Sequence, residues 1–138
     1  MAATRMMSVI GLKNAGKTTF LLALAAELAR RRFRVKTIKH DKEESDPIAL
    51  ARRSHAVADM VLVEGFEEAS LPKIEVYRRV AGPKPIFDPK KHDPGDWVAM
   101  VTDDADLRAP FPVFRFSDTS WLVTIANLAW DRAKILPP

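Results

Sequence analysis

The chain has 138 residues, of which 47% are hydrophobic and 29% charged, and its formal net charge is +4. This composition is that of a globular rather than a disordered protein, and the length suits one domain, expected over residues 1–138. The absence of cysteine excludes disulfides and thiolate metal sites. With no membrane-spanning apolar run, no secretory signal and no basic stretch interleaved with aromatic residues, we expect a cytoplasmic protein that binds neither membrane nor nucleic acid.

Apolar periodicity predicts strands and helices in alternation through the first half of the chain. Residues 5–10 are a short apolar run typical of a buried strand of a parallel sheet. Residues 18–32 carry apolar side chains at spacings of one, three and four, which indicates an amphipathic helix closed by arginines. A second strand is expected over residues 34–39. A short helix is expected over residues 46–56, because it opens with an Asp-Pro pair, an N-cap followed by proline in the first turn.

The second half continues the same alternation. Further strands are predicted over residues 59–64, 73–77, 97–102 and 112–116. Residues 80–96 contain four of the ten prolines and are expected to form a loop. Ser117 and Asp118 are expected to cap a final helix that ends before Pro137. The pattern predicts an α/β fold with a mostly parallel sheet flanked by helices.

Residues 11–18 read Gly-Leu-Lys-Asn-Ala-Gly-Lys-Thr and match the phosphate-loop pattern G-x-x-x-x-G-K-[ST] at every fixed position. In such a loop the backbone N–H groups and the start of the following helix bind phosphates, and the glycines permit the required backbone angles. The lysine supplies positive charge to the β- and γ-phosphates, and the threonine hydroxyl suits Mg²⁺. We therefore expect a nucleotide, with GTP favoured, to contact Gly11, Asn14, Ala15, Gly16, Lys17, Thr18 and Thr19.

Glu64 ends the apolar strand predicted over residues 59–64, at the edge where ligands of an open parallel sheet bind. An acid at this position holds magnesium in P-loop proteins, usually as Asp. We therefore expect Glu64 to bind Mg²⁺ together with Thr18 and to take part in catalysis with Lys17. The alternative is a solvated acid in a turn.

Other polar residues follow predicted strands at the same edge of the sheet. Asp41 is expected to approach magnesium or its water and to complete the catalytic set, and His40 to lie near the γ-phosphate. Asp103 is expected to accept hydrogen bonds from N1 and N2 of guanine, the groups that distinguish guanine from adenine. At each of these positions a plain polar turn remains the alternative.

The strand predicted over residues 73–77 follows its predecessor too closely for a helical crossover, so we expect it to pair antiparallel or to lie at an edge. An edge strand exposes unpaired backbone groups, which a two-fold partner can cover. A homodimer is therefore expected, with Ile74, Val76 or Tyr77 in its interface. Alternatively, the proline-rich loop covers this edge within one chain.

Four segments occur in the order found in one known family, at residues 11–19, 37–41, 61–66 and 72–78. So arranged, the chain resembles the molybdopterin-guanine dinucleotide biosynthesis protein B (MobB) family. The resemblance implies a P-loop fold, binding of GTP and Mg²⁺, and at most weak GTP hydrolysis. It also implies a homodimer and support of the partner guanylyltransferase that joins GMP to molybdopterin. Family members carry a longer segment after the Lys-His-Asp motif, and the gap is expected around residues 43–47.

Two functions of other classes stay open at this point. A P-loop kinase of small molecules would need an acceptor pocket and an arginine-rich lid, for which residues 80–96 are a poor candidate. A nucleotide-binding assembly module without turnover would need neither.

Overall fold

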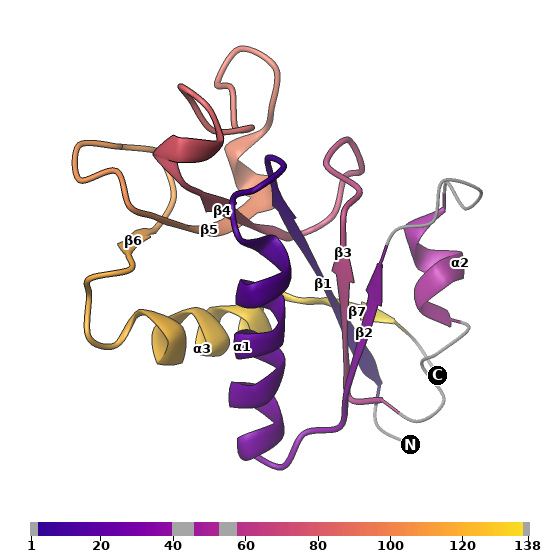
Figure 1. Cartoon of the computed structure of the whole chain (residues 1–138). Helices are drawn as coiled ribbons and strands as arrows, with labels where there is room; N and C mark the ends of the chain where they lie inside the picture. Colours follow the sequence, from indigo (N-terminus) through magenta and orange to yellow (C-terminus); the bar gives the residue numbers. More distant parts are fainter. Residues whose placement is uncertain (1–2, 40–45, 53–57, 137–138) are drawn as a thin grey trace.

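The computed structural model describes residues 3–39, 46–52 and 58–136, which form one seven-stranded sheet with helices against it (Figure 1). The strands are β1 (Thr4–Gly11), β2 (Val35–Lys39), β3 (Met60–Glu64), β4 (Lys73–Tyr77), β5 (Trp97–Thr102), β6 (Val113–Arg115) and β7 (Lys134–Leu136). The helices are α1 (Lys17–Arg30), α2 (Pro47–Arg52) and α3 (Trp121–Arg132), with short 3₁₀ turns at Arg79–Ala81 and Pro94–Asp96.

The sheet is mostly parallel, as predicted. Its strand order is β2-β3-β1-β4-β5-β6, and every neighbouring pair in this order is parallel. The exception is β7, which runs antiparallel beside the start of β1. The eight residues of β1 are long enough for β7 to pair with the first three and β4 with the last four, on the side away from β3.

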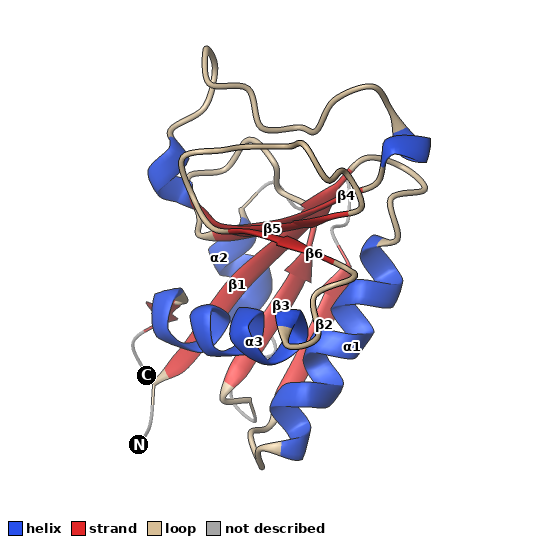
Figure 2. Ribbon diagram, turned by 90° about the vertical axis from the view of Figure 1, so that its left-hand side faces the viewer, coloured by secondary structure: helices blue, strands red, loops and turns tan. Residues whose placement is uncertain are grey.

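Each face of the sheet has its own apolar core. One core joins the strands to α1 and α3 and includes Met7, Phe20, Leu24, Leu62, Val76, Val101, Ile125 and Ala129. The other lies at α2 and includes Met6, Leu50, Val61, Val63, Phe66 and Leu71. Figure 2 shows α1 and α3 on one side of β4, β5 and β6, and the long connections on the other. Irregular connections therefore cover the part of this second face that α2 does not reach.

The prediction that β4 lies at an edge or pairs antiparallel is wrong. β4 lies between β1 and β5 and is parallel to both. Its connection from β3, residues 65–72, crosses β1 without a helix. Eight extended residues reach about 26 Å, whereas returning along a five-residue strand and across two strand spacings requires about 19 Å. A loop is therefore sufficient for this parallel crossover.

The interface predicted on β4 is wrong for the same reason. Ile74, Val76 and Tyr77 are at most 1% exposed within a single chain. They pack between the neighbouring strands and the layers on both faces, so they are not available to a second copy. The antiparallel extension of the sheet is β7, which was predicted as the end of the last helix.

The last helix begins and ends at other residues than predicted. The Asp118 carboxylate accepts a hydrogen bond from the Arg115 N–H at 2.8 Å and closes a turn before the helix, whose N-cap is Ser120. At the other end the chain leaves α3 and forms β7, because Leu136 is buried in the core beside α2. The first difference follows from a local turn, whereas the second depends on contacts with distant segments.

The short second helix starts as predicted. The carboxylate of Asp46 accepts the Ile48 N–H at 3.0 Å, and α2 follows from Pro47. Residues 53–56, the remainder of the predicted helix, lie outside the described part of the chain. Among the described residues, no helix has both the length and the apolar character required to cross a membrane.

Candidate functional site: the phosphate loop and its cavity

The predicted phosphate loop connects the end of β1 to the start of α1. Two of its residues have left-handed backbone angles, Gly16 with φ 92° and Asn14 with φ 69°. Gly11 is required for a different reason, since a Cβ there would lie 2.6 Å from the carbonyl oxygen of Val76 on β4. The glycines therefore serve both the turn of the loop and the close packing of β1 against β4.

A cavity of about 370 Å³ opens in front of this loop, at the carboxyl ends of the parallel strands. It is lined by Lys13, Asn14, Gly16, Lys17, Thr18, Thr19, Lys39 and Glu64. Of the residues predicted to contact nucleotide or metal, six thus share one cavity. The start of α1, with its free N–H groups, and three lysines make this cavity suited to a polyphosphate.

Thr18 and Glu64 meet inside this cavity although 46 positions separate them in the sequence. The Thr18 hydroxyl donates a hydrogen bond to Oε1 of Glu64 at 2.9 Å. The other carboxylate oxygen lies 4.0 Å from Nζ of Lys39, and the Glu64 side chain is only 11% exposed. A hydroxyl and a carboxylate side by side are hard oxygen donors, so the pair fits the ligand preference of Mg²⁺.

The other predicted residues lie elsewhere. Gly11 and Ala15 are buried behind the loop and support it. Asp103 follows β5 and lines a second cavity of about 260 Å³ with Thr102, Ala105, Arg115, Phe116 and Ser117. One Asp103 carboxylate oxygen accepts the backbone N–H of Arg79 at 2.9 Å. His40 and Asp41 lie outside the described residues.

Lys39 and Arg78 were missed as individual site residues. Lys39 ends β2 and lines the phosphate cavity, which its place at the carboxyl end of a parallel strand could have indicated. Arg78 directly follows β4, and its Nε donates a hydrogen bond to the carbonyl oxygen of Ala15 at 3.0 Å. Its guanidinium also covers the ring of Phe116, 3.8 Å from the centroid. No local pattern in the sequence predicts these contacts of Arg78.

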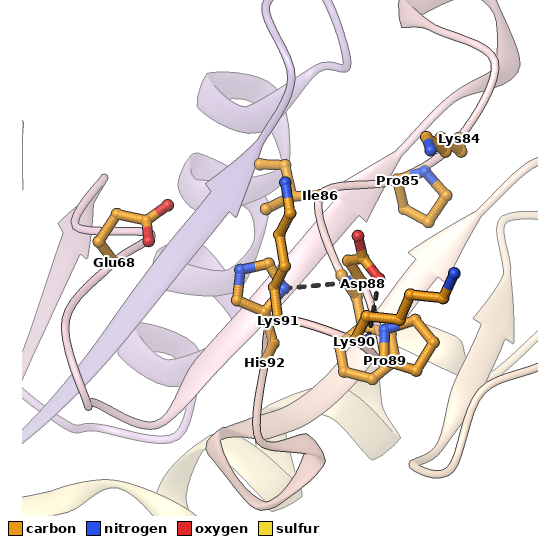
Figure 3. Close-up of a pocket in the computed structure, with 10 residues that line it drawn as sticks. Glu68, Lys84, Pro85, Ile86, Asp88, Pro89, Lys90, Lys91 and His92 are labelled. Atoms are coloured by element: carbon orange, nitrogen blue, oxygen red, sulfur yellow. Dashed lines mark hydrogen bonds between the residues drawn. The ribbon is translucent and has the colours of Figure 1, made fainter.

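A larger cavity, of about 630 Å³, lies in the proline-rich connection before β5 (Figure 3). Its lining includes the exposed Lys84, Lys90 and Lys91, together with Glu68. The backbone N–H of Asp88 donates to Nδ1 of His92 at 2.9 Å. In Figure 3 the lysine side chains point in different directions, and this cavity shares no lining residue with the phosphate cavity. Within the described residues, no cluster of His, Cys, Asp or Glu could hold a metal ion.

Glu75 of β4 holds this connection against the sheet. Its buried carboxylate accepts the backbone N–H groups of Ile86 at 2.6 Å and Phe87 at 3.1 Å, and Nε1 of Trp97 at 3.0 Å. Burial raises the pKa of Glu75, while the three donors act in the opposite direction. On the same strand, Nζ of Lys73 donates to the carbonyl oxygens of Glu67 and Ala69, in the connection that follows β3.

Comparisons with known proteins show relatives in sequence and in fold. The molybdopterin-guanine dinucleotide biosynthesis adapter protein of Haemophilus influenzae is 28% identical over an alignment of 123 residues, covering 60% of this chain and 69% of the relative. The crystal structure of a MobB protein homolog from Bacillus stearothermophilus superimposes with a TM-score of 0.64 at 22% identity, covering 92% of this chain and 99% of the other. Bacillus subtilis MobB gives a TM-score of 0.64 at 14% identity, covering 90% and 97%. These two structures share the fold of this chain.

The family described as Molybdopterin guanine dinucleotide synthesis protein B matches residues 6–50 and 43–103. The match includes the phosphate loop, Glu64 and β4, and its two segments overlap at residues 43–50, a range that includes the gap expected around residues 43–47. It covers well over half of the sequence. The chain therefore belongs to the molybdopterin guanine dinucleotide synthesis protein B family.

Proposed function

We propose that this chain binds GTP and Mg²⁺ in the phosphate cavity, hydrolyses GTP slowly, and acts as an accessory protein in molybdenum cofactor biosynthesis. Its partner would be the guanylyltransferase that joins GMP to molybdopterin. The observation that carries the proposal is the contact of Thr18 with Glu64 in a cavity lined by three lysines. The family to which the chain belongs supports the pathway.

Each residue of the cavity has a role that follows from its chemistry. The backbone N–H groups of the loop and the start of α1 bind phosphate oxygens, and Lys17 neutralises their charge. Thr18 and Glu64 would hold Mg²⁺, which supplies charge neutralisation at the β- and γ-phosphates when bound. Lys39 adds a further cation at the mouth of the cavity, where its side chain is 83% exposed. These groups favour binding, but none of them is a strong base, in keeping with slow hydrolysis.

Guanine recognition is proposed at the second cavity. Asp103 retains one carboxylate oxygen without a bond to Arg79, and a carboxylate accepts from both N1–H and N2–H of guanine. Adenine lacks this pair of donors. Calorimetric titration with GTP and with ATP, each with Mg²⁺, tests the proposal. Tighter binding of GTP supports it, whereas equal or tighter binding of ATP contradicts the assignment of GTP.

A small-molecule kinase is less well supported by the structure. Such an enzyme closes an arginine-rich lid over its substrates, and residues 82–96 contain no arginine. The backbone of this segment is also hydrogen-bonded to the buried Glu75. A nucleotide-binding module without turnover is distinguished by the next experiment.

Glu64→Gln is expected to lower Mg²⁺-dependent GTP hydrolysis by about tenfold to a hundredfold, because the amide keeps the shape but loses the charge. Binding of GTP should change by less than about threefold, since the phosphates are held by the loop and Lys17. The rate of phosphate release, measured across Mg²⁺ concentrations, is the readout. Glu68→Gln removes the same charge from an exposed side chain nearby and should leave the rate unchanged. A normal rate for Glu64→Gln would show that Glu64 does not hold the metal.

A homodimer also remains a proposal, which rests on the family resemblance. The interface cannot use the buried face of β4, so other surfaces must supply it. Sedimentation equilibrium at micromolar concentration, with and without GTP and Mg²⁺, is expected to give twice the monomer mass. A monomer mass under both conditions would contradict the proposal.

A further inference from the structure

Arg78 contacts both the phosphate loop and a residue that lines the second cavity, and the proposed function assigns these two places to one nucleotide. Its Nε donates to the carbonyl oxygen of Ala15, inside the phosphate loop. A Cβ at Gly16 would lie 3.1 Å from the same nitrogen, so the side chain packs directly against the back of the loop. The flat guanidinium also stacks on Phe116, which lines the cavity beside Asp103. One side chain thus contacts both halves of the candidate site.

These contacts require an arginine rather than any cation. A guanidinium is planar, so it can donate from Nε in its own plane and stack on an aromatic ring with its face. Lysine can supply the charge but not both contacts in this geometry. The three contacting segments are the residue after β4, the loop after β1 and the loop after β6.

We propose that Arg78 is a positioning residue that fixes the position of Phe116 relative to the phosphate loop, so that one nucleotide can occupy both cavities. The inference rests on the proposed function, because it concerns a ligand that has both a base and phosphates. The binding of a ligand that fills only the phosphate cavity does not depend on this relative position. A ligand that fills both cavities loses affinity when the two parts move independently, because binding must then order them.

Calorimetric titration with GTP and with inorganic triphosphate, each with Mg²⁺, tests this directly. Arg78→Met is expected to weaken GTP binding about tenfold more than it weakens triphosphate binding. The matched control is Arg79→Met, which removes the same charge from an exposed neighbour that contacts Asp103 through its backbone N–H. This control should weaken the binding of both ligands slightly and to the same extent, through the general loss of positive charge. Arg78→Lys is expected to behave like Arg78→Met.

A second variant tests the same contact by replacing Phe116. Phe116→Leu keeps an apolar side chain but removes the ring that the guanidinium covers, and it should also weaken the binding of GTP more than the binding of triphosphate. In the double variant the loss of GTP affinity should be no greater than in Arg78→Met alone, because both changes break the same contact. Additive losses would overturn the inference. Thermal unfolding by circular dichroism checks that each variant is folded, and Phe116→Leu carries the test if Arg78→Met is not.

The outcomes separate this inference from the proposed function. If the unaltered chain binds triphosphate or ATP as tightly as GTP or more tightly, the proposed function fails. If it prefers GTP but Arg78→Met matches Arg79→Met for both ligands, Arg78 does not position the site. If Arg78→Met weakens the binding of both ligands equally and more than the control does, Arg78 only stabilises the phosphate loop. Either of the last two results overturns the inference while the proposed function stands.

Discussion

Lys17→Ala is expected to weaken GTP binding by more than about a hundredfold, the loss of a charge-assisted contact with the phosphates. Lys17 is the first residue of α1 and lines the phosphate cavity, and it is not part of either apolar core. The loss of affinity should therefore reflect a lost contact with the ligand and not a change in the fold. Isothermal titration calorimetry with Mg²⁺ present measures the affinity, and thermal unfolding should be unchanged.

The matched control is Lys13→Ala, which removes the same charge from the same cavity. Lys13 is exposed and occupies a variable position of the loop pattern, so its replacement should cost less than about tenfold in affinity. The difference between the two variants isolates the specific contact from the general positive field. Equal losses would show that Lys17 acts only through charge, and an unchanged affinity of Lys17→Ala would contradict the phosphate site itself.

Glu75→Ala is expected to lower the free energy of unfolding by about 3 kcal/mol or more. The replacement leaves the N–H groups of Ile86, Phe87 and Trp97 without their acceptor, and it opens a void where the side chain is now fully buried. It also releases the connection that covers β4 and β5. Urea denaturation followed by tryptophan fluorescence suits this measurement, since Trp97 lies beside the replaced group.

Glu75→Gln serves as the control for this change. Glutamine keeps the length of the side chain and one acceptor oxygen, so this variant should lower the free energy of unfolding by about half as much or less. GTP affinity should change little in either folded variant, because Glu75 does not line the phosphate cavity. A loss below about 1 kcal/mol for Glu75→Ala would show that water replaces the missing acceptor.

Much of this fold could be predicted because its signals are local. The strands at residues 59–64 and 97–102 are continuous apolar runs, and burial on both faces of a parallel sheet requires that composition. The phosphate loop is likewise contiguous, and its glycines, lysine and threonine bring their backbone angles and chemistry with them. The place of Glu64 at the phosphate cavity could be predicted because ligands bind at the ends of parallel strands.

Topology was harder to predict, because it depends on which segments pair. β4 was expected at an edge, since its short connection seemed to exclude a parallel crossover, yet a loop of eight residues is sufficient. β7 was expected to continue the last helix, since Lys134–Leu136 has no strand pattern of its own. Its pairing with β1 supplies the partners that define it. Strand formation there follows from a neighbour that no local pattern shows.

The sequence by itself determined the phosphate loop, the acid opposite it and the mostly parallel sheet, because each depends on residues that are adjacent or periodic in the chain. Only the tertiary structure decided that one side chain, Arg78, contacts both the phosphate loop and a residue that lines the second cavity. The bond from Arg78 to Ala15 joins positions 63 residues apart, and Phe116 comes from a third segment. Such a contact depends on strand order and on the direction of a single side chain. Neither leaves a periodic trace in the sequence, so both must be read from the folded chain.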